Sequence, residues 1–209
     1  MDMKIYEYGD SSSHNVLIQP VDDYDLSVMD NECALITDAS GGDFYLIAVK
    51  VNNWNDDLSP WAAPPVFGNA AFGGRAEDTL SQVLELCPDK NRTYHIGGYS
   101  LAGLFALWAA YRTDVFSGVA AASPSVWFPH FRLFCEENRI RCDKVYLSLG
   151  DREEKTKNTV MAQVGDNIRR CNEILKAQGT DCCLEWNKGN HFNEPDVRTA
   201  KAFSWLLCR

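Results

Sequence analysis

Residues 93–110, TYHIGGYSLAGLFALWAA, predict a strand that passes directly into a helix. Residues 93–98 carry β-branched and aromatic side chains and end in two glycines, which is typical of a buried strand. From Leu101 onward, apolar residues recur at spacings of three and four, the period of one helix face. Ser100 therefore lies at the joint between the two elements.

The residues around Ser100 are small, as a sharp strand-to-helix turn requires. Gly98 and Ala102 flank Ser100 at two positions on either side, and Gly103 follows. Such a turn holds the serine hydroxyl clear of the sheet, and the first N–H groups of the helix point at the group that it attacks. The motif is G-x-S-x-G with Ala102 in place of the second glycine, and it predicts that Ser100 is a nucleophile. The alternative is a serine that only caps the helix.

The composition is that of one globular domain over residues 1–209, long enough to bury a full core. The net charge of −9 argues against a nucleic acid or an anionic membrane surface as a partner. The first fifteen residues lack the basic and apolar segments of a signal peptide. The longest apolar run is too short to span a membrane, so we expect no membrane partner.

The eight cysteines are scattered, with no C-x-x-C pair and no zinc-type spacing with histidine. This distribution predicts reduced, mostly buried thiols, a cytoplasmic location and no metal site.

Strands and helices are predicted to alternate along the chain. We expect strands at 3–8, 16–19, 44–51, 93–98, 116–121, 144–149 and 182–186, and helices at 29–38, 76–87, from 101, at 158–178 and at 196–208. Residues 22–25 are predicted to form an acidic loop, and residues 52–74 a long irregular segment. This alternation predicts an α/β fold with a mostly parallel sheet and helices on both faces.

A serine nucleophile needs a base, and the base needs an acid that orients it. In an open α/β sheet these groups belong on loops at the carboxyl ends of the strands. His191 follows the last predicted strand directly and is our candidate base. His95 lies inside a strand and His14 at the amino end of one, while His130 remains an alternative.

The acid is expected in the loop after residues 144–150, KVYLSLG. Glu153 lies three residues past the glycine, so a turn can bring its carboxylate back to the imidazole. Asp151 is the alternative acid, whereas Arg152 and Glu154 fit a solvated charge cluster. The order serine, acid, histidine is the one expected for this kind of site. The backbone N–H of Leu101 should hold the oxyanion, with a second donor from Val21 or Asp22.

Several motifs together resemble a known family. The segments GYSLAGLFALWAA (98–110), SLGDREE (148–154) and GNHF (189–192) are similar to those of bacterial esterases of the α/β-hydrolase fold. This broad group includes esterase D-like enzymes and siderophore-ester hydrolases. The segments NWNDDLSPW (53–61) and ASPSVWF (122–128) also resemble stretches of the group, so the resemblance extends from about residue 16 to residue 209.

The resemblance implies a three-layer α/β/α sandwich and cofactor-free hydrolysis of small carboxylic esters through an acyl-enzyme on Ser100. The chain leaves no room for a lid domain, so an open cleft floored by residues 52–74 is expected, with Trp54, Trp61, Phe67 and Trp127 as pocket-lining candidates. These aromatic residues are alternatively part of the core. An acyltransferase, thioesterase or peptidase on the same triad, and a non-catalytic binding protein on this scaffold, are the competing interpretations.

Overall fold

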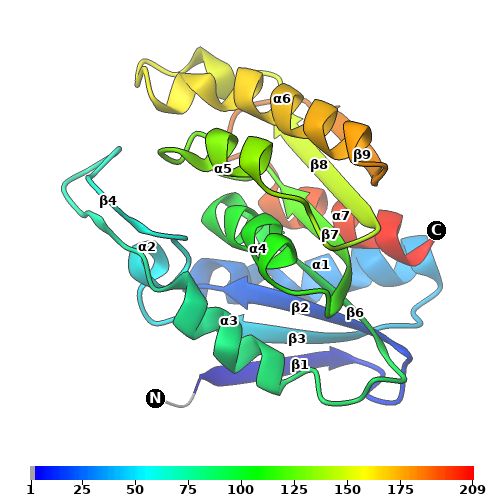
Figure 1. The fold of residues 1–209 in the computed structure, drawn as a ribbon. Coiled ribbons are helices and arrows are strands. Elements are labelled where there is room, and N and C mark those ends of the chain that lie inside the picture. The colour runs from blue at the N-terminus through cyan, green and yellow to red at the C-terminus, as the bar shows by residue number, and fades with distance from the viewer. Residues whose placement is uncertain (1–2) are drawn as a thin grey trace.

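The computed structural model describes residues 3–209, which contain a seven-stranded sheet (Figure 1). The strand order is β1-β3-β2-β6-β7-β8-β9. The strands are β1 (Lys4–Gly9), β2 (Asn15–Val21), β3 (Tyr45–Lys50), β6 (Thr93–Tyr99), β7 (Phe116–Ala122), β8 (Lys144–Gly150) and β9 (Asp181–Asn187). Only the pairing of β1 with β3 is antiparallel in this sheet. The predicted mostly parallel sheet is confirmed, and the bounds of each predicted strand differ from the observed ones by at most two residues.

Helices cover both faces of the sheet. On one face lie α1 (Asp23–Ser40) and α7 (Pro195–Leu207), whose apolar side chains share a cluster with β2, β3 and β7. On the other lie α3 (Ala76–Glu85), α4 (Ser100–Arg112), α5 (Phe131–Glu137) and α6 (Val164–Ala177). Figure 1 shows α1 and α7 behind the sheet and the other four in front. The result is the expected three-layer sandwich.

Helix α4 is buried along almost its whole length. Every residue from Leu101 to Tyr111 is buried, and the helix packs on β6 and β7. A helix that is apolar all round belongs in the interior, which explains the unbroken run of apolar and small residues after Ser100. Ser100 is therefore attached to a rigid, central element.

The N-terminus of α1 corrects the sequence prediction, which took residues 22–25 as a loop and began the helix at 29. The Asp22 carboxylate accepts hydrogen bonds from the N–H groups of Tyr24 and Asp25. The Asp25 carboxylate in turn accepts one from the Asp22 N–H. This reciprocal capping box starts the helix at Asp23. The acidic run is the cap and first turn, where negative charge also complements the helix dipole.

Three further segments differ from the prediction. Within 52–74 the chain forms a short helix, α2 (Trp54–Asp57), and a small hairpin of β4 (Ala62–Ala63) and β5 (Phe72–Gly73). The predicted helix at 158–178 begins instead with a 3₁₀ turn, Met161–Gln163, and becomes α-helical at Val164. Helix α5 was not predicted.

Other whole-chain predictions stand as follows. One domain over 1–209 stays a prediction, and residues 1–2 lie outside the described residues. All eight cysteines lie within residues 3–209 and are free thiols, but only Cys135, Cys142 and Cys171 are buried, so the prediction of mostly buried thiols is wrong. Within residues 3–209 no helix has both the length and the apolar character needed to cross a membrane.

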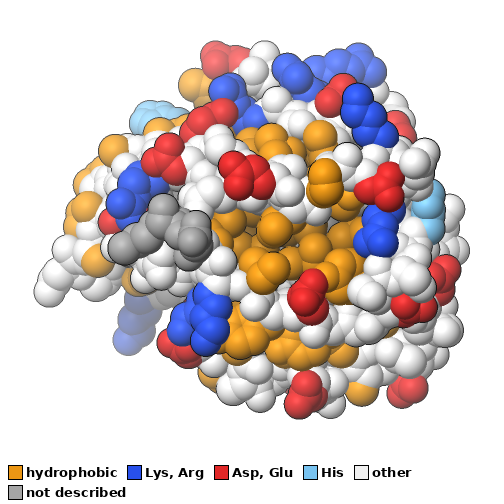
Figure 2. All heavy atoms as spheres, turned by 90° about the horizontal axis from the view of Figure 1, so that it is seen from below, with side chains coloured by type: hydrophobic (Ala, Val, Ile, Leu, Met, Phe, Trp, Pro, Cys, Tyr) orange, Lys and Arg blue, Asp and Glu red, His pale blue; other side chains and the backbone are white. Residues whose placement is uncertain are grey.

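On the face seen from below, at the β1 side of the sheet, hydrophobic side chains gather centrally among charged ones (Figure 2).

Candidate active site

The turn that carries Ser100 is strained and tightly packed. Ser100 has a φ of 56°, in the left-handed region that side chains other than glycine rarely adopt. A Cβ atom on Gly98 would lie 2.7 Å from the Cβ of Ala102, and one on Gly103 would lie 2.9 Å from the Gly98 carbonyl oxygen. Ala102 therefore fits in place of the usual second glycine because Gly98 leaves the space for its methyl group.

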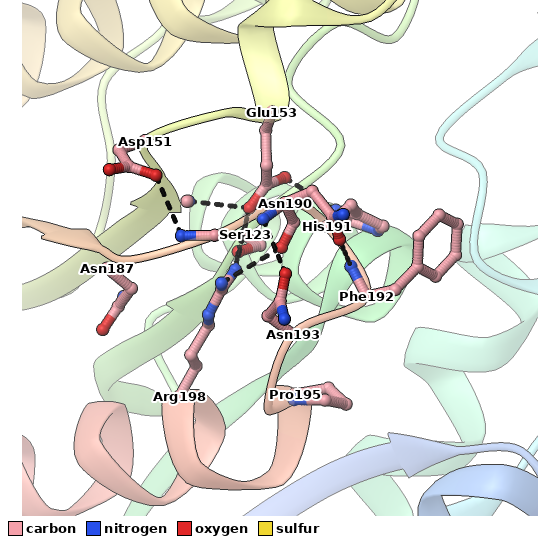
Figure 3. A network of polar contacts seen from close by, with 12 residues as sticks. Ser123, Asp151, Glu153, Asn187, Asn190, His191, Phe192, Asn193, Pro195 and Arg198 are labelled. Atoms are coloured by element: carbon pink, nitrogen blue, oxygen red, sulfur yellow. Dashed lines mark hydrogen bonds and ion pairs between the residues drawn. The ribbon is translucent and has the colours of Figure 1, made fainter.

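A chain of hydrogen bonds links Ser100, His191 and Glu153. The Oγ of Ser100 lies 2.9 Å from Nε2 of His191, and Nδ1 of His191 lies 2.7 Å from Oε2 of Glu153. The three residues come from the β6–α4 turn and the loops after β8 and β9. These points all lie at the carboxyl ends of parallel strands, which brings them together at one edge of the sheet. Figure 3 shows the Glu153 carboxylate facing the imidazole.

Glu153 is only 8% exposed, and its carboxylate has four hydrogen-bond partners in the protein. Besides His191, its Oε1 accepts hydrogen bonds from the Gly150 N–H at 2.7 Å, the Ser123 hydroxyl at 2.7 Å and Arg198 at 2.9 Å. Burial alone would raise the pKa of Glu153, but His191, the Gly150 N–H and the Ser123 hydroxyl hold that pKa below its usual value. The carboxylate is therefore ionised at neutral pH.

Arg198 is the main residue that the sequence analysis missed. It lies on α7, is 2% exposed, and besides Glu153 it donates to the carbonyl oxygens of Lys188 and Asn190 in the loop that carries His191. It also donates to the hydroxyl of Tyr99, which itself donates to the His191 carbonyl at 2.8 Å. Figure 3 shows the guanidinium beneath this loop and the carboxylate. No local signal distinguishes Arg198 from a surface arginine, because its partners are distant in sequence.

The alternative acid, Asp151, lies outside the hydrogen-bond chain. Asp151 is exposed, and its carboxylate accepts from the Gly189 N–H at 2.8 Å, so it ties the loop after β8 to the loop after β9. Its hydrogen bonds among the described residues do not include His191. Glu154 forms an ion pair with Arg169 at 3.1 Å near the surface, as a solvated charge cluster would.

The other three histidines lie away from Ser100. His95 is buried in β6, as expected, and burial together with the nearby charge of Lys144 lowers its pKa to about 4. The ring of His14 lies 3.0 Å from the hydroxyl of Thr93. His130 precedes α5 with a φ of 66°. Within residues 3–209, His191 alone among the histidines hydrogen-bonds Ser100.

The backbone donors expected for an oxyanion are partly in place. The N–H of Leu101 is in the first turn of α4, and Tyr99 at the N-cap provides no side-chain hydrogen bond to that turn. Val21 is the last residue of β2, its side chain is buried, and the expected role of its backbone N–H stays a prediction. Asp22 lines that cavity, and its N–H donates to Asp25 at 3.1 Å.

A second serine, also missed, lies beside Ser100. The Oγ of Ser125 is 3.3 Å from that of Ser100, and the Ser125 N–H donates to the Ser100 carbonyl at 3.0 Å. Ser125 is buried in the segment 122–128 that follows β7. Its N–H therefore holds the backbone of the turn in place.

Two cavities meet at His191 and Phe192. The first, of about 400 Å³, includes Ser100, Tyr24, Trp54 and Asp25 in its lining. The second, of about 300 Å³, includes Trp127, Met161, Arg152 and Lys155. Within residues 3–209 no separate domain lies over either cavity.

The aromatic residues of the expected pocket divide between cleft and core. Trp54 lines the first cavity and Trp127 the second. Trp61 lines neither: its ring lies 5.7 Å from those of both Phe128 and Phe134, and its Nε1 donates to the Pro129 carbonyl. Its role in substrate binding stays a prediction, and these contacts favour the alternative that Trp61 is part of the core. Phe67 is an exposed ring packed edge-on against Trp127, and it lines neither cavity.

The described residues hold no group of three or more His, Cys, Asp or Glu side chains arranged to bind a metal ion.

Solved structures share this architecture. Siderophore hydrolase EstA from Aspergillus nidulans is 20% identical, with a TM-score of 0.71 over 96% of this chain and 85% of that one. An IroE-like serine hydrolase from Shewanella oneidensis is 16% identical, with a TM-score of 0.76 over 99% of this chain and 76% of the other. The chain has the α/β-hydrolase fold. The Bacillus cereus carboxylesterase, 12% identical, gives a TM-score of 0.62 over 98% and 94% of the two chains.

No protein-family model and no curated protein matches the sequence. The structural similarities confirm the expected fold. Because the sequence identities are this low, the similarities show the fold alone.

Proposed function

We propose that this chain is a serine hydrolase that cleaves carboxylic esters through an acyl-enzyme on Ser100. The observation that carries the proposal is the unbroken hydrogen-bond chain from the Ser100 hydroxyl through His191 to the buried Glu153 carboxylate. It is supported by solved structures of the same fold whose names describe a siderophore hydrolase, a serine hydrolase and a carboxylesterase.

In the first half-reaction the Oγ of Ser100 attacks the ester carbonyl carbon while Nε2 of His191 takes the hydroxyl proton. Glu153 holds Nδ1 of His191 in the donor state, so that Nε2 is the free base, and it stabilises the imidazolium that forms. The tetrahedral intermediate collapses as His191 returns the proton to the leaving alkoxide. Products of this step are the alcohol and the acylated serine.

In the second half-reaction a water molecule replaces the alcohol. His191 takes a proton from the water, whose oxygen attacks the acyl carbon, and it then protonates Ser100 as the carboxylic acid leaves. The N–H of Leu101 is positioned to donate to the oxyanion in both steps. The Asp22 N–H donates to the Asp25 carboxylate in this structure. For this N–H to act as the second oxyanion donor, that hydrogen bond must break.

The test is hydrolysis of a series of p-nitrophenyl esters by the wild type and by Ser100→Ala. We expect kcat/KM to fall at least about 10³-fold in the variant with folding unchanged, as for other serine nucleophiles. A fluorophosphonate probe should label the wild type at Ser100, as mass spectrometry of the peptide would show. Full activity in Ser100→Ala, or labelling at another serine, would rule out Ser100 as the nucleophile.

The competing acyl-transfer functions are separated in the same assay by adding an alcohol, amine or thiol acceptor and analysing products. Predominant hydrolysis is the expected result.

A further inference from the structure

The cavity at Ser100 combines acidic and aromatic side chains. Asp22 and Asp25 line it together with the rings of Tyr24, Trp54 and Phe192. Tyr24 is 58% exposed and Phe192 is 86% exposed. Large rings that remain this exposed around a nucleophile indicate surface that a ligand covers.

The two carboxylates keep unused hydrogen-bonding capacity. Asp22 uses Oδ1 for the N–H groups of Tyr24 and Asp25, and Asp25 uses Oδ2 for the N–H of Asp22. In residues 3–209 neither carboxylate forms an ion pair, and the remaining oxygen of each accepts no protein hydrogen bond. Lysine and arginine are absent from the lining of this cavity. Burial and the charge of Asp22 raise the pKa of Asp25 to about 7, so Asp25 is only partly ionised near neutral pH, and a bound cation would favour its ionised form.

The second cavity has the opposite character. Arg152 and Lys155 line it, with an apolar surface formed by Trp127, Met161 and Val164. His191 and Phe192 separate the two cavities, so the cleft is acidic on the side of the nucleophile and basic on the other. A general surface excess of acid would not produce this division.

A cation is the ligand that these groups suit. Carboxylates attract it directly, and aromatic faces attract it through their quadrupoles, most effectively for alkylated ammonium groups that are weakly hydrated. A neutral ligand would desolvate the carboxylates without compensation, and an anion would be repelled. A bound cation would also offset the unfavourable effect of these carboxylates on the oxyanion that forms nearby.

We propose, on the basis of the hydrolase function above, that the preferred substrates are esters that carry an alkylammonium group, bound in the Ser100 cavity by Asp22, Asp25 and the surrounding rings. The uncharged half of the ester then lies toward the second, largely apolar cavity. Asp25, Trp54 and Phe192 are specificity-determining residues in this assignment.

The experiment uses pairs of esters that have the same shape. In each pair one member carries a trimethylammonium group and the other has carbon in place of the nitrogen. One pair has the group on the alcohol side and a second on the acyl side, well separated from the carbonyl so that reactivity is equal. We expect kcat/KM to favour the ammonium member about tenfold in at least one pair, as a desolvated cation–π and ionic contact would give.

Variants locate the effect. Asp25→Asn and Trp54→Leu should each lower the ammonium-to-neutral ratio about threefold or more. Asp38→Asn removes the same charge from the other end of α1 and should leave the ratio unchanged. Because both esters are measured on one preparation, a loss of folded enzyme cancels from the ratio.

The outcomes separate the two proposals. A wild type that cleaves the neutral esters with a ratio of one or less in both pairs overturns the ammonium inference and leaves ester hydrolysis standing. A fall in Asp38→Asn equal to that in Asp25→Asn also overturns it, since the effect would be long-range. Failure to cleave any ester, with no probe labelling of Ser100, overturns the hydrolase function and the inference that rests on it.

Discussion

At the scale of single residues, two carboxylates only two positions apart have different roles. Glu153 is buried and contacts His191, whereas Asp151 is exposed and contacts the Gly189 N–H. We expect Glu153→Gln to lower kcat about 10²- to 10⁴-fold, because an amide disturbs the tautomer and cannot stabilise the imidazolium. Asp151→Asn should cost less than about tenfold. Steady-state kinetics on both variants checks this, and a larger loss in Asp151→Asn would reverse the assignment.

Arg198 is a positioning residue that acts through Glu153 and the loop carrying His191. Removing its charge in Arg198→Met leaves the buried Glu153 carboxylate less compensated, which favours the protonated form of Glu153. The acid limb of the kcat/KM pH profile should therefore move to higher pH, along with a fall in kcat. Arg198→Lys keeps the charge and should move the limb less.

A purely structural role for Arg198 would reduce the amount of active enzyme without moving that limb. Active-site titration of each variant provides the control, since it corrects kcat for inactive protein.

At this scale the sequence predicted the three residues of the hydrogen-bond chain but not the residue that supports them. Ser100, His191 and Glu153 stand next to strand ends, so a local pattern and the chain order brought them to attention, and the structure places them in contact. Arg198 could not be found in this way, because its burial and its hydrogen bonds to Tyr99, Glu153 and the loop carrying His191 arise only in the folded chain. For Trp61 the sequence leaves pocket and core open, because the packing of its ring against Phe128 and Phe134 arises only in the folded chain.

At the scale of elements, the turn between β6 and α4 depends on shared space between Gly98 and Ala102. Gly98→Ala adds a methyl group 2.7 Å from that of Ala102 at a φ of 156°, so we expect it to lower stability by about 1–3 kcal/mol and to reduce kcat. Adding Ala102→Gly removes the clash and should restore part of both losses. A double-mutant cycle by denaturant unfolding and kinetics measures the coupling. Strictly additive effects would mean that the two methyl groups do not compete.

Elements with a regular apolar period were predicted well, and elements defined by caps or tertiary contacts were not. The five central strands, β2, β3, β6, β7 and β8, were found because buried parallel strands form continuous apolar runs. The start of α1 was missed because four polar residues, DDYD, resemble a loop until Asp22 and Asp25 are recognised as reciprocal caps. Helix α5, of only seven residues, has too few turns for a periodic signal.

At the scale of the whole molecule, Glu32 should make stability depend on pH. It is 2% exposed on α1, its Oε2 accepts one hydrogen bond from Gln19 at 3.4 Å, and its Oε1 has no partner among the described residues. Burial, with the charges of Asp25 and Asp196, raises its pKa well above the usual value. Since the folded pKa exceeds the unfolded one, the contribution of Glu32 to the stability of the wild type should fall as pH rises above about 4.5.

Glu32→Gln removes this titration at nearly the same shape. We expect the variant to be more stable than the wild type by about 1–3 kcal/mol at pH 8, with a smaller difference at pH 5. Denaturant unfolding at both pH values measures it, with the exposed Glu137→Gln as control. A difference that does not change between the two pH values would contradict the prediction.

The position of α7 has a consequence for how the chain is made. This helix packs against β6, β7 and β8 and brings Arg198 to Glu153, yet it follows all of those strands in sequence. On the ribosome, the central strands emerge while one of their faces is still bare and the site glutamate has no guanidinium beside it. The nascent chain therefore exposes an apolar surface until residues 195–207 have left the exit tunnel. Before they emerge, we expect chaperones to bind this surface.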